Sequence, residues 1–294
     1  MTGLHLVSHA KINLTLQVSP KREDGYHDID SVVQIIDIAD ELRLTKRSDS
    51  VIEVDVDAPD IPSGANNLVY RACRAFFEST GIRAGVRCEL TKRIPAQAGL
   101  GGGSANAAEA IVGLDRLYGS AFSTQRLTQI AAKVGSDVAL FVHGGTVRIR
   151  GTGDRVEPLP DAPRLDLVIV QPEIGVSTAW AYAQLDKSAT REAAGASDQM
   201  ERAIRAQDCG AMIDGLRNDF DPVVSGELEA VRAAKLALIE QNARAAMLAG
   251  SGSAVFGIYN SDSEAWAAAG KLEEHFPSVF AAHTLTRSES RRKT

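Results

Sequence analysis

The sequence is poor in cysteine and in aromatic side chains, and it has no long apolar run. Three of its 294 residues are cysteines, and Phe, Trp and Tyr together make up 5%. The cysteines (Cys73, Cys88 and Cys209) are odd in number and too unevenly spaced for a disulfide framework or a CxxC zinc pattern, so we expect three reduced thiols. Since no stretch of about 18 apolar residues occurs, we also expect no transmembrane helix and no membrane partner.

Positive charge is outweighed by negative charge. Lys and Arg number 32 against 38 Asp and Glu, which gives a net charge of −6. A net-acidic chain does not attract phosphate backbones or anionic lipid, so we expect no nucleic-acid partner, although a local basic pocket can still bind a small phosphate ligand. The first 16 residues lack a basic segment followed by an apolar block, so no signal peptide is predicted and a cytoplasmic location is expected.

The apolar fraction of 44% and the mean hydropathy of −0.10 are typical of a globular protein with a sizeable core. Strand-like and helix-like periodicities alternate irregularly along the chain, which predicts an α+β fold. A proline-rich polar segment at 158–164 suggests two domains, 1–159 and 160–294. In the first domain we expect strands at 3–9, 11–18, 30–37, 41–47, 51–57 and 86–90, helices at 68–80, 104–118 and 123–134, and a hairpin at 145–159.

The second domain is expected to begin with a buried strand, LDLVIVQP. The segment ARAAMLAGSGSAVFGIY predicts two strands joined by a Gly-Ser turn, and the tail SESRRKT is expected to fray. The predicted helices of this half span about 178–186, 197–207, 227–242 and 263–275.

A glycine-rich loop is the most informative segment for chemistry. Gly99 and the run Gly101–Gly103 stand directly before Ser104 and an apolar helix. Glycines let a ligand approach the backbone, and a helix start offers free N–H groups, so the loop predicts a phosphate site. It is neither a Walker A loop, since no Lys follows, nor the GxGxxG dinucleotide fingerprint, since Ser104 replaces the last glycine. The alternative is a turn that serves close packing alone.

Other candidate residues are less specific on their own. Asp137 precedes an apolar run and could supply a partly desolvated carboxylate, but an Asx turn or helix cap is the simpler interpretation. Lys11 could be an ordinary strand-edge lysine, and Tyr26 with His27 an ordinary solvated loop. The Gly-Ser turn at 249–253 is either a plain hairpin or a second loop folded over the same phosphate site.

These segments together resemble the GHMP kinases. PAQAGLGGGSANAA is similar to the phosphate-binding motif of that family, and AGSGSAVFG to its C-terminal glycine motif. The opening AKINLTLQVSPKREDGYHDIDSVVQIIDIAD, with GSDVALFVHGG, GTGDRVEPL and RNDFDPVV, resembles members that act on a substrate bearing a cytidine diphosphate group. The resemblance implies ATP-dependent phosphorylation of the 2-hydroxyl of a methylerythritol unit, in the non-mevalonate isoprenoid pathway.

The resemblance also implies a fold and a set of roles. The fold is a two-domain α+β GHMP kinase: an N-terminal domain like domain 2 of ribosomal protein S5, a C-terminal ferredoxin-like domain, and the active site in the cleft between them. ATP and Mg²⁺ are the implied cofactors. The implied catalytic pair is Lys11 and Asp137; the substrate contacts are Asn13, Tyr26, His27, Thr178 and Tyr182; the ATP contacts are Asn67, Pro95, Gly99, Leu100, Gly101, Gly102, Gly103, Ser104 and Ala105, with Ser104 also a Mg²⁺ ligand.

Three positions depart from the family pattern. Ala105 stands where a second Ser is common, Ala139 where Pro is common, and Asp221 where Glu is usual. These changes bear on fine geometry and rate, because the glycines, the lysine and the aspartate are all present.

Three other functions compete with this interpretation. One is a GHMP kinase for mevalonate, homoserine or a sugar, which would not need the aromatic loop at Tyr26. The second is a non-catalytic nucleotide sensor on the same fold, which would be expected to lose Lys11, Asp137 or Ser104. The third is RNA binding through the S5-like domain, which the net charge of −6 disfavours. A monomer or a weak homodimer is expected.

Overall fold

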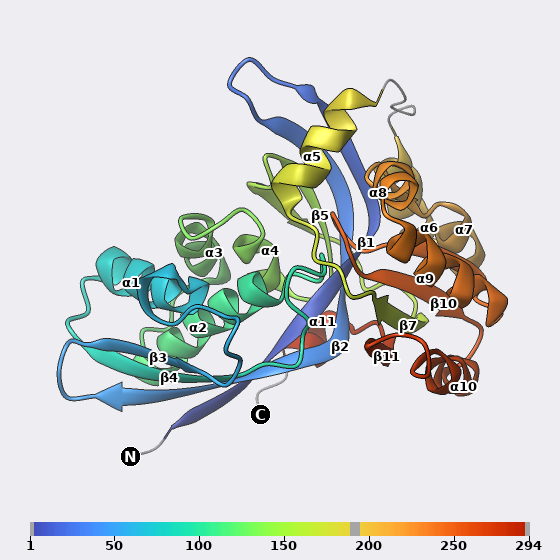
Figure 1. Ribbon diagram of the computed structural model, residues 1–294. Coiled ribbons are helices and arrows are strands. Elements are labelled where there is room, and N and C mark those ends of the chain that lie inside the picture. Colours follow the sequence, from blue (N-terminus) through green and yellow to red (C-terminus); the bar gives the residue numbers. More distant parts are fainter. Residues whose placement is uncertain (1–2, 189–194, 292–294) are drawn as a thin grey trace.

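The computed structural model describes residues 3–188 and 195–291, and it contains two β-sheets with helices packed on them (Figure 1). The larger sheet has the strand order β3-β4-β2-β1-β8, with β5 and β6 continuing from β2. The smaller sheet is antiparallel, in the order β11-β7-β10-β9. The predicted α+β class is confirmed.

The larger sheet is built on two long antiparallel strands. β1 alone covers 18 residues, or about 60 Å of extended chain. It therefore runs through both halves of the molecule and ends in a hairpin beside α5 (Thr178–Lys187) (Figure 1). The strands of this sheet are β1 (Leu4–Lys21), β2 (His27–Arg47), β3 (Ile52–Val56), β4 (Gly85–Thr91), β5 (Thr146–Gly151), β6 (Arg155–Pro158) and β8 (Arg217–Asn218).

Four helices and one 3-10 turn stand between the strands of the N-terminal half, and the four helices share a core with the larger sheet. The 3-10 turn is η1 (Gly64–Asn66), and the helices are α1 (Leu68–Thr80), α2 (Gly102–Tyr118), α3 (Thr124–Ala132) and α4 (Val138–His143).

The smaller sheet consists of β7 (Asp166–Gln171), β9 (Ala245–Leu248), β10 (Val255–Tyr259) and β11 (Ser278–His283). The helices of the C-terminal half, besides α5, are α6 (Ala196–Arg205), α7 (Cys209–Asp214), α8 (Asp221–Glu227), α9 (Glu229–Glu240), α10 (Asp262–Leu272) and α11 (Arg287–Ser290). Of these, α6 and α11 contact the long strands of the larger sheet.

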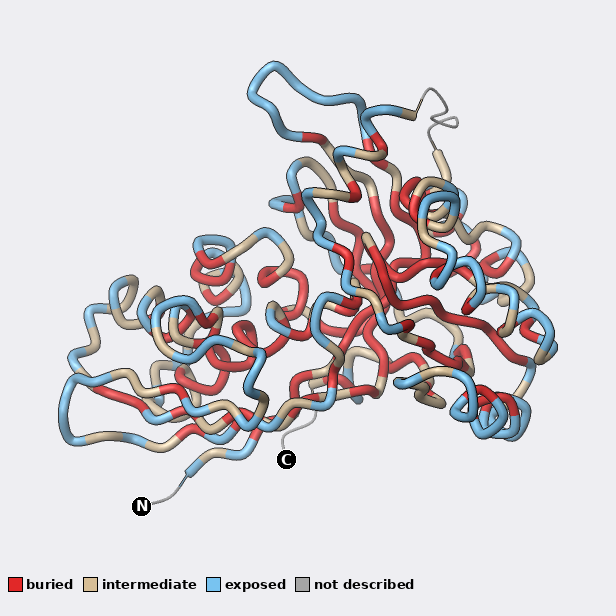
Figure 2. The backbone as a smooth tube through the Cα atoms, viewed as in Figure 1, coloured by how far each residue is buried: buried red, intermediate tan, exposed pale blue. Residues whose placement is uncertain are grey.

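Period-two alternation along β1 decides which of its side chains face the apolar core. Ile12 and Leu14 are fully buried against the core that also contains Ile169 and Phe256 of the smaller sheet. The intervening side chains of an extended strand point to the opposite face, so Lys11 is directed away from that apolar core. Figure 2 shows the buried centre of the molecule, where β1 and β2 pass side by side from one half to the other.

Some predicted elements differ in extent from the observed ones. The pairs 3–9 with 11–18, and 30–37 with 41–47, are each one strand, because a register shift between His9 and Lys11 absorbs the break in alternation. The predicted helix 227–242 is confirmed as α9, which is two residues shorter at each end. The short helix α8, which the extended Leu228 separates from α9, was not predicted. The domain boundary at 159/160 stays a prediction; it lies between β6 and β7, although β8 returns to the larger sheet.

The expectation of a frayed tail is wrong for the residues that are described. Thr286 and Glu289 form a capping box that starts α11, and Ser290 Oγ accepts a hydrogen bond from Gly145 N at 3.0 Å. The capping box starts the helix, and the bond from Gly145 anchors it to the N-terminal half. Residues 292–294 of the predicted tail lie outside the described residues.

Candidate active site

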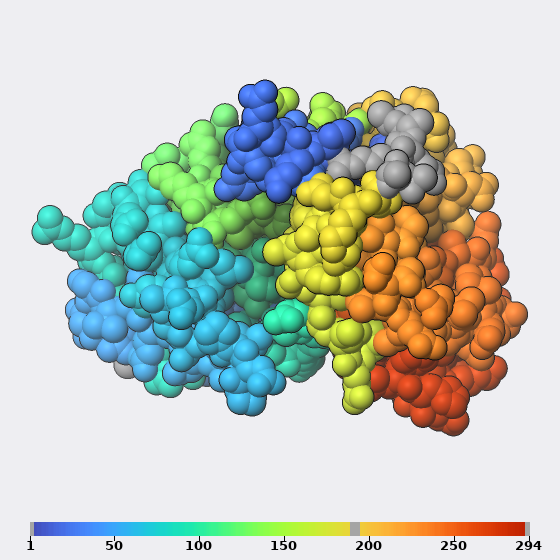
Figure 3. Space-filling view, turned by 45° about the horizontal axis from the view of Figure 1, so that its top comes forward, coloured from blue at the N-terminus to red at the C-terminus, as the bar shows by residue number. Residues whose placement is uncertain are grey.

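A large cleft separates the N-terminal helices from α5 and the second glycine loop, and the space-filling view shows this hollow beside the yellow α5 (Figure 3). Its volume is about 1340 Å³. Pockets for a single small ligand usually measure about 300–1,000 Å³, so this cleft has room for two substrates side by side.

Lys11 projects into the cleft from the middle of β1. It is only 5% exposed, and its Nζ donates to Asn13 Oδ1 at 2.6 Å. Burial lowers the pKa of Lys11 from 10.5, because the charged form loses hydration, while the nearby Asp137 carboxylate raises it and offsets part of this effect. The lysine is therefore an internal strand residue beside a negative charge, and the strand-edge interpretation is wrong.

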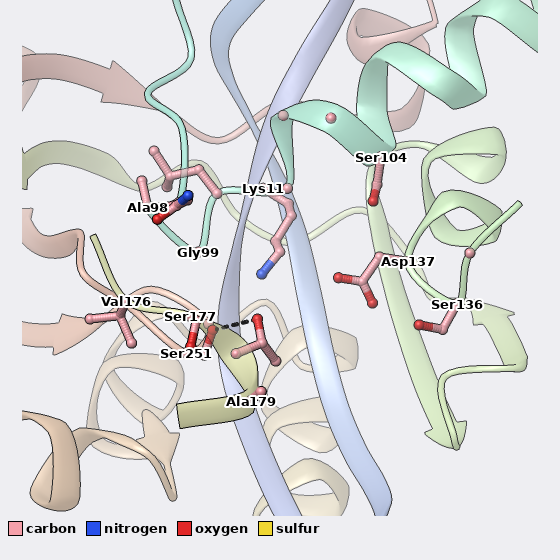
Figure 4. Close-up of a pocket in the computed structure, with 18 of the residues that line it drawn as sticks. Lys11, Ala98, Gly99, Ser104, Ser136, Asp137, Val176, Ser177, Ala179 and Ser251 are labelled. Atoms are coloured by element: carbon pink, nitrogen blue, oxygen red, sulfur yellow. Dashed lines mark hydrogen bonds between the residues drawn. The ribbon is translucent and has the colours of Figure 1, made fainter. Parts of the chain in front are cut away.

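Asp137 stands at the start of α4, a helix of six residues. It occupies the N-cap position, but its side chain makes no capping hydrogen bond. In Figure 4 the carboxylate of Asp137, the Nζ of Lys11 and the hydroxyl of Ser104 point into the same space. The carboxylate is consequently available to a ligand in the cleft.

The glycine loop is tied directly to the strand that carries Lys11. Lys11 N donates to Leu100 O at 3.0 Å, and α2 begins two residues later, with Gly101 as its N-cap at φ 74°. No side chain caps α2, so the amides of its first turn face the cleft together with Ser104. Free amides at a helix N-terminus bind anions, which supports the phosphate-site prediction over the packing turn.

The second Gly-Ser turn packs against the first loop. Ala254 N donates to Ala98 O at 3.2 Å, and Gly252 lines the same cleft. At Gly99, which has φ 76°, a Cβ atom would stand 1.9 Å from Ala249 O, so only glycine allows this approach. The turn joins β9 and β10 and is also part of the site, as the second interpretation of the sequence expects.

The far end of the cleft is lined by aromatic and imidazole rings from the hairpin and from α5. Tyr26 is 66% exposed, whereas the His27 ring lies 5.0 Å from the Tyr182 ring. Tyr182 also packs edge-on against Phe220 at 4.9 Å, and burial raises the pKa of Tyr182 to about 12. His27 Nδ1 donates to Ser19 O at 2.9 Å, and its Nε2 lies 3.4 Å from an Asp186 carboxylate oxygen.

The remaining predicted contacts are distributed unevenly. Pro95, Asn67 and Thr178 line the cleft. Asn67 caps α1 by accepting from Val69 N at 2.8 Å, and Thr178 Oγ1 lies 3.2 Å from Ser251 Oγ. Ala105 is placed differently: it is 1% exposed and lines a small separate cavity under α2, and its amide donates to Gly101 O.

Several residues of the site were not singled out from the sequence. Lys92 lines the cleft and pairs with the fully buried Asp40, and Asn218 Nδ2 holds the second glycine loop through Gly250 O at 2.7 Å. Ser31 Oγ accepts a hydrogen bond from Asn13 Nδ2 at 2.8 Å. Asn218 lies in the segment RNDFDPVV, whose resemblance to the GHMP kinases could have indicated it from the sequence. Lys92 and Ser31 have no local signature, because their partners are 52 and 18 residues away.

Comparisons with known proteins show which family the chain belongs to. The family models described as GHMP kinases N terminal domain and GHMP kinases C terminal match residues 67–145 and 200–278. The structure of a homoserine kinase from Cytophaga hutchinsonii has a TM-score of 0.79 at 19% identity, covering 97% of this chain and 95% of that one, which shows the shared fold. The chain belongs to the GHMP kinase family, whose members are ATP-dependent small-molecule kinases.

Closer relatives identify the branch of that family. The 4-diphosphocytidyl-2-C-methyl-D-erythritol kinase of Pelotomaculum thermopropionicum is 41% identical over 252 residues, covering 86% of this chain and 88% of that protein. The Alkaliphilus metalliredigens enzyme of the same name is 35% identical over 293 residues, covering 100% and 99%. A crystal structure of 4-(cytidine 5'-diphospho)-2C-methyl-D-erythritol kinase has a TM-score of 0.80 at 28% identity, covering 96% and 99%. Within the GHMP kinases, the chain belongs to the 4-diphosphocytidyl-2-C-methyl-D-erythritol kinase family.

Proposed function

We propose that this chain transfers the terminal phosphate of ATP to the 2-hydroxyl of 4-diphosphocytidyl-2-C-methyl-D-erythritol, giving the 2-phosphate and ADP in the non-mevalonate isoprenoid pathway. The observation that carries the proposal is the convergence of Lys11 and Asp137 beside the glycine loop, in a chain whose relatives bear that kinase's name.

The acceptor is a tertiary hydroxyl, which is a very weak acid. Asp137 would accept its proton late in the transfer, and the Lys11 ammonium would stabilise the developing negative charge on the oxygen. Most of the acceleration in phosphoryl transfer comes from positioning and charge stabilisation, which the buried lysine and the loop amides can supply.

The residues present also fit a Mg²⁺ ion. Mg²⁺ prefers oxygen ligands and usually keeps several waters and substrate phosphates in its shell. The Ser104 hydroxyl offers an oxygen donor that points into the cleft (Figure 4). Within residues 3–188 and 195–291, no group of three or more His, Cys, Asp and Glu side chains could hold a metal ion. A Mg²⁺ ion in this cleft would therefore be coordinated mainly by phosphate and water oxygens. When bound, Mg²⁺ would neutralise charge on the phosphates.

The cytidine end of the substrate would occupy the region of the hairpin and α5. A pyrimidine ring stacked on Tyr182 and Tyr26 gains apolar contact. The polar groups of His27 can form hydrogen bonds with the edge of that ring. The nucleotide would lie toward Asn67 and the start of α1. Each of these contacts is part of the proposal.

The test is ³¹P NMR of the purified protein with Mg·ATP and 4-diphosphocytidyl-2-C-methyl-D-erythritol. Parallel tubes contain mevalonate or homoserine in place of that substrate. A new phosphomonoester signal only in the cytidine tube, growing with ADP, is the expected result. A signal with mevalonate or homoserine would establish another GHMP kinase activity, and ATP binding without transfer in any tube would favour the nucleotide sensor.

None of the helices within 3–188 and 195–291 is long and apolar enough to cross a membrane.

A further inference from the structure

A line of buried polar groups continues from Lys11 away from the cleft. Lys11 Nζ donates to Asn13 Oδ1 at 2.6 Å, Asn13 Nδ2 donates to Ser31 Oγ at 2.8 Å, and Ser31 Oγ donates to the Thr15 carbonyl. Asn13 is 3% exposed and Ser31 is 0% exposed. Water therefore does not compete for these bonds.

The directions of these hydrogen bonds allow only one orientation of the Asn13 side-chain amide. The Thr15 carbonyl can only accept, so it takes the single proton of the Ser31 hydroxyl. The Ser31 oxygen is then an acceptor toward Asn13, and it must face the amide nitrogen. The amide oxygen is thereby turned toward Lys11, whose ammonium can only donate.

We propose that Ser31 is a positioning residue, which sets the orientation of the Asn13 amide and thereby the direction of the Lys11 ammonium toward the reacting hydroxyl. This inference rests on the proposed function. Ser31 comes from β2 and Lys11 from β1, so the orientation of the lysine depends on the pairing of the two long strands.

Loss of the Ser31 hydroxyl would remove one of the two groups that select this amide orientation and leave only the Lys11 ammonium to hold it. A flipped Asn13 would present its N–H groups to the Lys11 ammonium, and two sets of donors repel each other in a buried site. The ammonium would then turn elsewhere or lose its proton. Burial already lowers the pKa of Lys11, and Asp137 is the charged group that opposes this effect, so a lost acceptor lowers that pKa further.

The chain offers a matched control for the packing effect of the substitution. Ser197 is also 0% exposed, and its hydroxyl lies 2.9 Å from Thr15 Oγ1 and donates to Asp30 O at 3.2 Å. Ser197→Ala removes the same group from the same neighbourhood, but it leaves the bond between Ser31 and Asn13 intact.

The experiment compares Ser31→Ala with Ser197→Ala in steady-state assays across the alkaline range. We expect Ser31→Ala to lower kcat about tenfold, the order set by one hydrogen bond to a charged group, with KM for ATP almost unchanged. Its alkaline limb should also move to lower pH, and Ser197→Ala should change neither quantity. Equal loss of kcat in both variants, with the limb unmoved, would overturn the proposal. If Ser31→Ala does not fold, Ser31→Cys is used, since a thiol is a poor acceptor of similar size.

A second variant tests the orientation directly. In Asn13→Asp both side-chain oxygens accept, so Ser31 has no orientation to select. The added cost of Ser31→Ala should therefore be much smaller in the Asn13→Asp background than in the wild type. The same cost in both backgrounds would contradict the proposal.

NMR titration of the Lys11 side chain separates this inference from the proposed function. If the wild type transfers no phosphate, the proposed function fails. A lower Lys11 pKa in Ser31→Ala, with no change in Ser197→Ala, would still support the positioning role. An unchanged Lys11 titration would reject that role even in an active enzyme.

Discussion

The amide of Lys11 donates to the carbonyl of Leu100 at 3.0 Å, so the strand that carries the cleft lysine also holds the glycine loop. One backbone bond thus links the proposed catalytic lysine to the loop that is proposed to bind the phosphates. The distance between the two is set by rigid main chain rather than by flexible side chains, and phosphoryl transfer depends strongly on such positioning.

Asp137→Asn tests the proton acceptor. The amide cannot take a proton, so we expect kcat to fall by about 10²–10⁴-fold, the usual contribution of a general base. The ATP affinity should stay nearly constant, because α4 begins at Val138 and the Asp137 side chain makes no capping bond to lose. Single-turnover kinetics and ATP titration measure the two quantities separately. Turnover like the wild type would remove Asp137 from this role, and loss of ATP binding would indicate a structural one.

The pH profile tests the charge on Lys11. The proposed mechanism requires the ammonium form, so activity should be full below the Lys11 pKa and fall as the pH rises through it. Burial lowers that pKa from 10.5, with Asp137 opposing the shift, so the alkaline limb of kcat should lie below 10.5. Lys11→Arg is the control, because a guanidinium does not titrate there, and its residual activity should show no such limb. A limb that persists in Lys11→Arg would belong to another group.

Tyr182→Leu tests the cytidine end of the cleft. Leucine keeps apolar bulk against Phe220 but removes the ring face. Loss of one base-stacking contact of about 1–3 kcal/mol should raise KM for the cytidine substrate by roughly 5- to 150-fold. KM for ATP should change little, since the glycine loop belongs to a different end of the cleft. Equal increases in both KM values would defeat the assignment.

Gly99→Ala tests the contact between the two glycine loops. The added Cβ would overlap Ala249 O at 1.9 Å on a residue with φ 76°, so the loops must separate. We expect a loss of at least about 1–2 kcal/mol of unfolding free energy, with weaker ATP binding. Gly226→Ala in α8 is the matched control: its Cβ meets nothing within 4 Å, and it should stabilise the protein by about 0.5–1 kcal/mol. Thermal unfolding with and without Mg·ATP measures both. A Gly99→Ala protein as stable as the wild type would show that the loops do not need this approach.

Elements with local start and stop signals agree with the sequence-based expectation. Helix α1 begins after Asn67, whose side chain accepts from Val69 N, and it ends at Gly81 in the left-handed conformation. Ser123 starts α3 in the same way. Short elements such as α4, α7 and β11 were not predicted, because six residues carry too little periodicity to distinguish a helix from a strand.

The sequence by itself determined the α+β class, the glycine loop and the identity of the residues that belong to the kinase family. These depend on patterns within a few residues of one another, and on motifs that a single segment contains. The tertiary structure alone decided that Lys11 is buried, that the second glycine loop packs on the first, and that Ser31 stands behind Asn13. Those relationships arise from the pairing of β1 with β2 and from the packing of the two sheets. They join residues far apart in the chain, where no local preference can indicate which groups meet.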